Sequence, residues 1–185
     1  MPRTGMRAGA GAYAADMKRL NPLRRPVLAM LPALLAACAG PGLTALQPGL
    51  DEAQLLQRWG APTGRYALDA GTRLEYALGP AGRETWMVDL DAQGRTLHWR
   101  QVLDWRHLQA VQGSLPGMTR EQLLRTLGRA SHVRDGGRQG GQVWSWRHDS
   151  PFCLWFQASI GEDGRVRDAS FAPDPECDAR DDYDG

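Results

Sequence analysis

The sequence predicts an α+β fold made of two tandem units, each a short helical segment packed on a three-stranded antiparallel meander. Two observations lead to this prediction. A block that runs from Gly49 to Gly60 returns between Gly117 and Gly128, with the same eleven-residue spacing of its glycines. Strand-like stretches follow each block in the same order, at an offset of 68 to 70 residues. A supersecondary unit that recurs in order along a chain indicates a duplicated architecture.

Each repeated block predicts a helix. Asp51 and Thr119 stand where a side chain can cap the first helical turn, and Gly60 and Gly128 stand where a helix ends. Between these limits, apolar residues recur at the spacing of one helix face. This face holds Leu55, Leu56 and Trp59 in the first copy and Leu123, Leu124 and Leu127 in the second. We therefore expect each helix to pack on its own sheet.

Three strands are expected after each helix. Aromatic residues indicate the first strand, alternation of apolar and polar residues indicates the second, and a turn rich in Asp and Gly leads into the third. In the first unit these strands are 74–76, 86–90 and 96–102, with the turn at 91–95. In the second unit they are 142–146, 156–160 and 166–171, with the turn at 161–165.

The spacing of these elements sets the expected boundaries. Leu108 and Val111 predict a short helix in the link between the units. The C-terminal tail carries four aspartates, so we expect it to be disordered and acidic. The boundaries are 49–105 for the first unit, 106–116 for the linker, 117–177 for the second unit and 178–185 for the tail.

A lipoprotein signal is indicated near the start of the chain. Four basic residues at 18–25 precede an apolar run of twelve residues, Pro26 to Ala37, which is too short to cross a bilayer as a helix. The run ends in Leu35-Ala36-Ala37-Cys38, which resembles the lipobox of bacterial lipoproteins. The resemblance implies that Cys38 is lipidated and that residues 1–37 are a signal peptide removed by cleavage. An uncleaved anchor, or a core helix that ends in a buried cysteine, is the alternative interpretation.

The lipoprotein signal also predicts where the protein starts and which residues connect the lipid to the folded domain. A signal read from Met17 has an ordinary length, so Met17 is the alternative start of the protein. Residues 38–48 are rich in Gly and Pro, which predicts a short flexible tether.

The charge balance changes if residues 1–37 are removed. Subtracting their six basic residues and one acid from totals of 22 and 21 leaves 16 basic and 20 acidic residues. This acidic balance, with scattered arginines, argues against nucleic acid as a partner.

The cysteine count supports an envelope location. If Cys38 carries lipid, Cys153 and Cys177 remain as a pair, and a disulfide between them is the natural interpretation in an oxidising compartment. Such a bond would tie the Pro173-Asp174-Pro175 segment back to a strand. Two independent buried thiols are the alternative, because the sequence does not establish pairing geometry.

No stretch of the sequence predicts catalysis, a metal or a cofactor. The four histidines lack metal-ligand spacing, and His148-Asp149-Ser150 are neighbours, whereas a triad is assembled from distant segments. The segment from Asp89 to Gly94 begins like a calcium loop, but Arg100 stands where a bidentate Glu is required. The glycines at 136–141 lack the lysine and helix of a phosphate loop. We therefore expect a protein that is not an enzyme.

Seven tryptophans raise the question of a binding surface, because Trp and Arg are enriched at interface hot spots. Trp144, Trp146 and Trp155 on neighbouring strands, beside Arg147, form a candidate partner-docking patch. Packing of these rings inside the second meander is the alternative.

The second unit contains three distinctive strings, Gly117 to Gly128 (GMTREQLLRTLG), Trp144-Ser145-Trp146 and Asp163-Gly164-Arg165-Val166. Together they resemble the SmpA/OmlA lipoproteins, the BamE-like family. Ala130 replaces the family's proline here, and the first copy has Gly49-Leu50-Asp51 in place of Gly-Met-Thr. Tandem units of this type also resemble the β-lactamase inhibitor protein, which lays a concave sheet on its target.

These resemblances imply two kinds of function. The first is a lipid-anchored interaction module of the outer membrane that faces the periplasm, with a role in envelope maintenance or β-barrel assembly and a protein partner there. Ala39 favours the outer membrane, because an aspartate after the lipidated cysteine would favour retention at the inner membrane. The alternative is an inhibitor or binding protein directed at a periplasmic or extracellular enzyme.

Overall fold

The fold is taken from a computed structural model that describes residues 43–177. All the described residues belong to one compact part of the chain. The predicted signal peptide, Cys38 and the predicted tail at 178–185 lie outside the described residues. Among the helices that are described, none is long and apolar enough to span a membrane.

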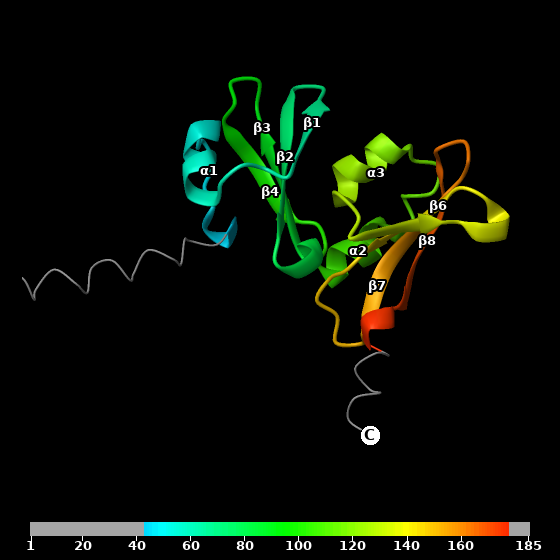
Figure 1. The fold of residues 1–185 in the computed structure, drawn as a ribbon. Coiled ribbons are helices and arrows are strands. Elements are labelled where there is room, and N and C mark those ends of the chain that lie inside the picture. Colours follow the sequence, from blue (N-terminus) through cyan, green and yellow to red (C-terminus); the bar gives the residue numbers. More distant parts are fainter. Residues whose placement is uncertain (1–42, 178–185) are drawn as a thin grey trace, which may run out of the picture. The chain divides into compact units, whose positions relative to one another are not determined.

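The described chain is α+β and contains two four-stranded antiparallel sheets (Figure 1). The strands of each sheet are neighbours in sequence order, β1-β2-β3-β4 and β5-β6-β7-β8. The first group of elements is η2 (Leu43–Ala45), α1 (Glu52–Trp59), β1 (Gly64–Leu68), β2 (Gly71–Leu78), η3 (Pro80–Gly82), β3 (Glu84–Leu90) and β4 (Thr96–Gln101). The second group is α2 (Trp105–Gln112), α3 (Arg120–Leu127), β5 (His132–Asp135), η4 (Gly137–Gln139), β6 (Gln142–Trp146), β7 (Leu154–Ile160) and β8 (Val166–Pro173).

Each sheet has one strand more than the sequence predicted. The additional strands are β1 and β5, which lie at sheet edges and pair with one neighbour only, β2 and β6 respectively. All four residues of β5 are exposed, so this strand lacks the alternation of a half-buried strand. The predicted three-stranded meander is therefore wrong in strand number. The Gly-rich stretch at 136–141 is the turn that joins β5 to β6.

The two predicted helices form where the caps indicated. Asp51 and Thr119 each accept a hydrogen bond from the backbone N–H three residues on, and each helix has a full capping box. Gly60 and Gly128 end α1 and α3 with φ of 79° and 80°, a backbone conformation that favours glycine. The apolar face is narrower than predicted in α1, because Leu56 is 52% exposed.

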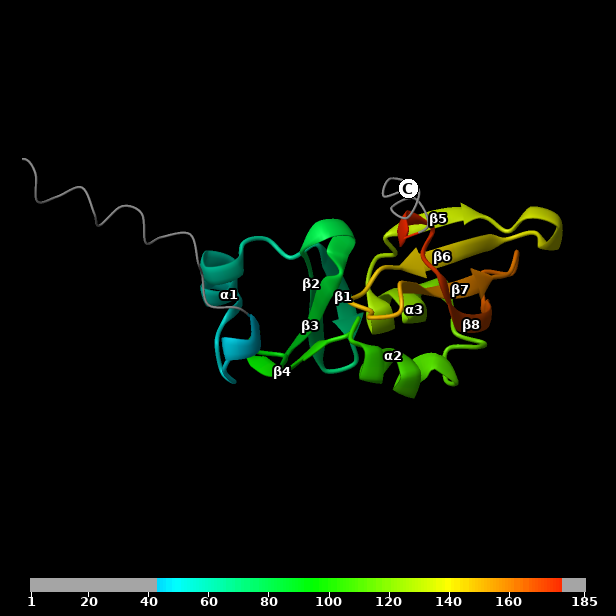
Figure 2. The same cartoon turned by 90° about the horizontal axis from the view of Figure 1, so that it is seen from below.

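The structure has a core on each side of the first sheet. On one face, α1 and η2 cover side chains of β2 and β3 such as Leu74 and Val88. On the other face, Met87 of β3 packs with Leu108 of α2 and Leu123 of α3 in the core of the second unit. Helices α2 and α3 thus lie between the two sheets (Figure 2). The first sheet is covered on both faces.

A buried carboxylate joins the first sheet to the end of α3. Glu75 is fully buried, accepts a hydrogen bond of 2.5 Å from the Tyr66 hydroxyl and accepts another of 3.1 Å from the Arg129 N–H. Nearby, Arg73 forms a bidentate pair with Asp89 and donates to the Arg125 carbonyl at the C-terminal end of α3. Two paired carboxylates of the first sheet therefore lie at the contact with the second unit.

The first unit includes residues that the sequence assigned to the tether. The tether was expected to extend to residue 48, yet Leu43 and Leu46 are 1% and 4% exposed and belong to the core under α1. The expected linker at 106–116 holds most of α2, whose Leu108 is fully buried. Residues 43–48 are thus part of the first unit and not a free tether.

Candidate functional site

The predicted tryptophan patch is divided between the two faces of the second sheet. Trp144 and Trp146 lie opposite Ala158 and Phe156, on the inner face that packs against α2 and α3. Trp146 is fully buried, and its Nε1 donates to the Gly128 carbonyl at 3.0 Å. Trp155 precedes Phe156 on β7 and therefore points to the other face, which we call the outer face. The alternative interpretation, packing inside the unit, holds for Trp144 and Trp146.

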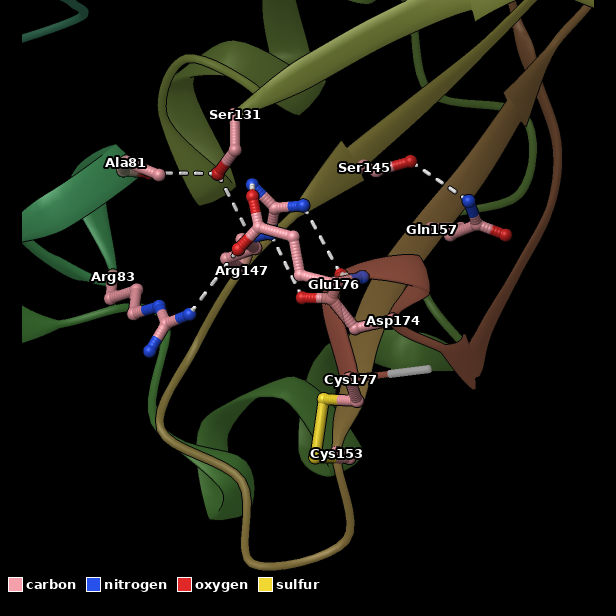
Figure 3. Close-up of polar contacts among 10 residues, drawn as sticks. All are labelled: Ala81, Arg83, Ser131, Ser145, Arg147, Cys153, Gln157, Asp174, Glu176 and Cys177. Atoms are coloured by element: carbon pink, nitrogen blue, oxygen red, sulfur yellow. Dashed lines mark hydrogen bonds and ion pairs between the residues drawn. A yellow bond between two sulfur atoms is a disulfide. The ribbon is translucent and has the colours of Figure 1, made fainter. Parts of the chain in front are cut away.

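On the outer face, Arg147 is the centre of a compact cluster (Figure 3). Its Nε and Nη2 donate to the two carboxylate oxygens of Asp174 at 2.8 and 3.1 Å. Its Nη1 lies 2.6 Å from Glu176 Oε1. Planar, bidentate contacts of this kind are the strong form of an arginine ion pair. We call Arg147, Trp155, Asp174 and Glu176 the Arg147 cluster.

Trp155 forms the floor of the cluster. The guanidinium carbon of Arg147 lies 5.7 Å from the centre of the Trp155 ring, within the range of a cation–π contact. His132 of edge strand β5 is stacked on the same ring with centroids 6.2 Å apart. Trp155 is only 7% exposed, although α2 and α3 lie on the other face. Its Nε1 makes no hydrogen bond with any residue in the described range.

The acidic half of the cluster comes from the short segment after β8. Cys153 and Cys177 form a disulfide with Cα atoms 6.0 Å apart, and the Asp174 N–H donates to the Cys153 carbonyl at 2.9 Å. The bond therefore ties the segment from Asp174 to Cys177 to the start of β7. As a result both carboxylates are held over Arg147.

The charges of the cluster stabilise one another. Burial alone would raise the pKa of Asp174, but hydrogen bonds from Arg147 and from the Glu176 N–H outweigh burial and hold this pKa below its usual value. The hydrogen bond to Asp174 in turn raises the pKa of Arg147. Arg147 and Asp174 are therefore both charged at neutral pH.

Arg147 is also held from the side of the first unit. Its backbone N–H donates to Ser131 Oγ at 3.0 Å, and that hydroxyl donates to the Ala81 carbonyl at 2.8 Å. Arg83 of the first unit reaches Glu176 at 3.9 Å. The basic half of the cluster is thus positioned by β5, β6 and the loop after β2.

A cavity of about 360 Å³ adjoins the cluster and is lined in part by His148, Asp149 and Ser150. These three residues do not form a triad. His148 Nδ1 lies 3.3 Å from the Asp149 backbone carbonyl, and Ser150 Oγ accepts from the Phe152 N–H. Burial lowers the pKa of His148, so its ring is neutral at pH 7. The geometry supports a polar turn with a buried histidine, not a nucleophile and its base.

The segment that begins like a calcium loop is a β-hairpin. Asp91 Oδ1 accepts from the backbone N–H groups of Gln93 and Arg95 across the turn, and Asp89 is paired with Arg73. Over residues 43–177, no group of three or more His, Cys, Asp or Glu side chains is arranged to hold a metal.

Sequence reasoning found Arg147 and Trp155 but missed their partners, Asp174 and Glu176. Arg147 and Asp174 are 27 positions apart, and they meet only because β6 and β8 end at the same edge of the sheet, on either side of β7. No local pattern marks such a contact. The predicted disulfide was the available signal, because it placed residues 173–175 near Cys153.

The fold and this cluster define an α+β protein with two antiparallel sheets and an arginine-centred surface site. No protein-family model matches the chain, and no curated protein matches it. A DUF4309 family protein, YjgB from Bacillus subtilis, has a similar solved structure with 14% identity and a TM-score of 0.27, over 66% of this chain and 78% of that one. An extracellular protein containing an SCP domain, from Bacillus anthracis, has 14% identity and a TM-score of 0.24, over 71% of this chain and 45% of that one. These similarities are too weak to support a functional argument.

Proposed function

We propose that this chain is a lipid-anchored interaction module of the outer membrane, facing the periplasm, that works by contacts with a protein partner. The observation that carries the proposal is the outer face of the second sheet. On this face, exposed side chains such as His132 and Ser170 surround an arginine that lies over a tryptophan, and both members of this pair are largely covered. Arg and Trp on a sheet face are the residue types that dominate protein interfaces.

The two units support an origin by duplication of one BamE-like unit. Each has a helix with a capping box, a glycine end and a four-stranded sheet in the same order. Arg95 donates to the Gly49 carbonyl and Arg165 to the Gly117 carbonyl, at matching positions. The bridges Asp51 to Arg95 and Thr119 to Arg165 also correspond. A role in envelope maintenance or barrel assembly rests on the sequence resemblance to the BamE-like family.

The lipid anchor rests on the sequence around Cys38. Leu43, already in the first core, is five positions after Cys38. An extended chain spans at most about 3.5 Å per residue, so a lipid at Cys38 would keep the domain close to the membrane surface. This position suits a module that meets a membrane-bound partner.

The alternative, an inhibitor that lays one concave sheet surface on an enzyme, is not favoured by this arrangement. The first sheet is covered on one face by α1 and on the other by the second unit, so the two sheets do not share an open face. Among the sheet faces of residues 43–177, the outer face of the second sheet is the one that neither helices nor the other unit cover.

Two measurements test the proposal. Labelled palmitate should enter the wild-type chain and place it in the outer-membrane fraction, and Cys38→Ser should lose both properties. The wild-type chain should also co-purify with the barrel-assembly complex after crosslinking. A chain that is never lipidated, or that recovers no component of that complex, would count against the corresponding half of the proposal.

A further inference from the structure

The segment Asp174–Cys177 has the features of a ligand bound to the rest of its own chain. Asp174 and Glu176 supply two carboxylates to Arg147, and Glu176 also approaches Arg83. The segment follows the last strand and adds no side chain to either hydrophobic core. Its attachment depends on these ion pairs, on backbone hydrogen bonds around Asp174 and on the disulfide.

In the receiving half of the site, the Arg147 backbone and the Trp155 ring are held by residues outside that segment, whereas the guanidinium nitrogens contact Asp174 and Glu176. The backbone of Arg147 is fixed by Ser131, and its guanidinium lies over Trp155, which is stacked on His132. If the segment moved away, the site would keep an arginine fork above an aromatic ring. The Trp155 indole N–H is buried and has no hydrogen-bond partner among residues 43–177.

We propose that this site binds an acidic segment of a partner protein, with carboxylates spaced as in Asp-Pro-Glu, and that the Cys153–Cys177 disulfide keeps the site closed. The inference rests on the proposed function. It adds the chemistry of the partner segment and the bond that controls access to the site. The occupant seen here fixes that chemistry: two carboxylates two residues apart, one bidentate on Arg147. An incoming segment replaces Asp174 and Glu176 with carboxylates of the same kind.

The disulfide is placed to act as the latch. Cys153 is exposed and has φ of 51°, a left-handed conformation that a non-glycine residue rarely adopts. Because Asp174 and Glu176 lie between the end of β8 and Cys177, both ends of the segment are held while the bond is intact. Breaking the bond frees one end and converts a fixed occupant into a tethered competitor.

Opening requires a protein dithiol as reductant. One of its thiolates attacks Cys153, forms a mixed disulfide and releases the Cys177 thiolate; its second thiol then attacks the mixed disulfide and releases Cys153. Two electrons and two protons pass to the two cysteines, and the dithiol becomes a disulfide. The exposure of Cys153 gives the attacking thiolate access.

The test uses the full chain in detergent and a fluorescein-labelled peptide with the sequence of residues 171–176, FAPDPE. Binding is measured by fluorescence anisotropy before and after reduction with dithiothreitol. We expect the reduced chain to bind at least about tenfold more tightly, because the competent fraction of sites rises. A peptide with Asn and Gln at the two acidic positions should lose that binding. Equal binding by both peptides, or by both redox states, would overturn the proposal.

Variants separate the site from its latch. In the reduced chain, Arg147→Ala should abolish binding, and Arg134→Ala, at an exposed arginine of the same sheet, should leave it unchanged. Replacing Asp174 and Glu176 together by Asn and Gln should tighten binding about fivefold, because the internal competitor is weakened. The Cys153→Ser chain should bind the peptide without reduction, which would show that binding does not result from damage by dithiothreitol. If the reduced chain does not bind the peptide but the wild-type chain still crosslinks to an envelope protein, this inference is overturned and the proposed function stands.

Discussion

Replacing Gly128 with alanine should destabilise the protein more than the same change at Gly60. Both glycines end a helix in almost the same conformation, with φ, ψ of 80°, −171° and 79°, −167°. The backbone penalty for a non-glycine residue there is about 1–3 kcal/mol and should be shared. A Cβ at Gly60 meets nothing within 4 Å, but at Gly128 it would lie 3.0 Å from Glu75 Cδ and 3.0 Å from Thr85 Cγ2. Overpacking of this kind adds about 1–3 kcal/mol.

The assay is urea unfolding of the full chain followed by tryptophan fluorescence, with the disulfide intact. Gly128→Ala should lose about 1–3 kcal/mol more than Gly60→Ala, or about 2–12 °C in melting temperature for a chain of this size. In a Glu75→Ala background the excess should shrink, because the carboxylate is gone. Equal losses at Gly60 and Gly128 would refute the close contact between the buried carboxylate and the end of α3.

Three further predictions concern buried polar groups and the disulfide. Tyr66→Phe should cost about 1–3 kcal/mol in urea unfolding, because Glu75 loses a hydrogen-bond donor. Burial and the Glu75 carboxylate raise the pKa of Tyr66, so the folded chain keeps a proton that the unfolded chain releases above its usual value of 10.0. Stability should therefore fall as pH rises through about 10, and fall less in Tyr66→Phe; identical pH profiles would contradict this. Burial lowers the pKa of His148 below 6.5, so the unfolded chain binds a proton first and stability should decline as pH falls below about 6.5. His148→Gln should make that decline smaller but not remove it, because burial also lowers the pKa of His107; an unchanged slope would contradict the assignment to His148. Cys153→Ser should lower the unfolding free energy by about 3 kcal/mol, since the bond spans 24 residues; a loss near zero would show that the unfolded chain is not constrained by it.

Local signals in the sequence were sufficient for the helices and the hairpin turns. Asp51 and Thr119 cap α1 and α3 because capping depends on residues three positions apart. The turn from Asp91 to Arg95 forms because one aspartate carboxylate can accept several nearby backbone N–H groups. The sequence did not predict the edge strands β1 and β5, because a strand that is paired on one side only has little apolar surface to bury.

The division of the tryptophan patch shows where local reasoning ends. Trp146 is opposite Phe156, so Trp155 must point to the other face. A register shifted by one residue would reverse this, and register is set by pairing across the sheet, not by either strand alone. The partners of Arg147 were likewise out of reach, because Asp174 and Glu176 meet it only through the ends of two strands and a disulfide.

Site-specific photocrosslinking in living cells tests whether a partner protein binds the outer face of the second sheet. A photoreactive residue is placed at Ser170, which lies opposite Gln157 on that face, and at Leu97, which is 61% exposed on β4 of the first unit. If the outer face binds a partner, position 170 should give one discrete adduct with an envelope protein and position 97 should give none. Adducts from position 97 alone, or equal adducts from both positions, would contradict it.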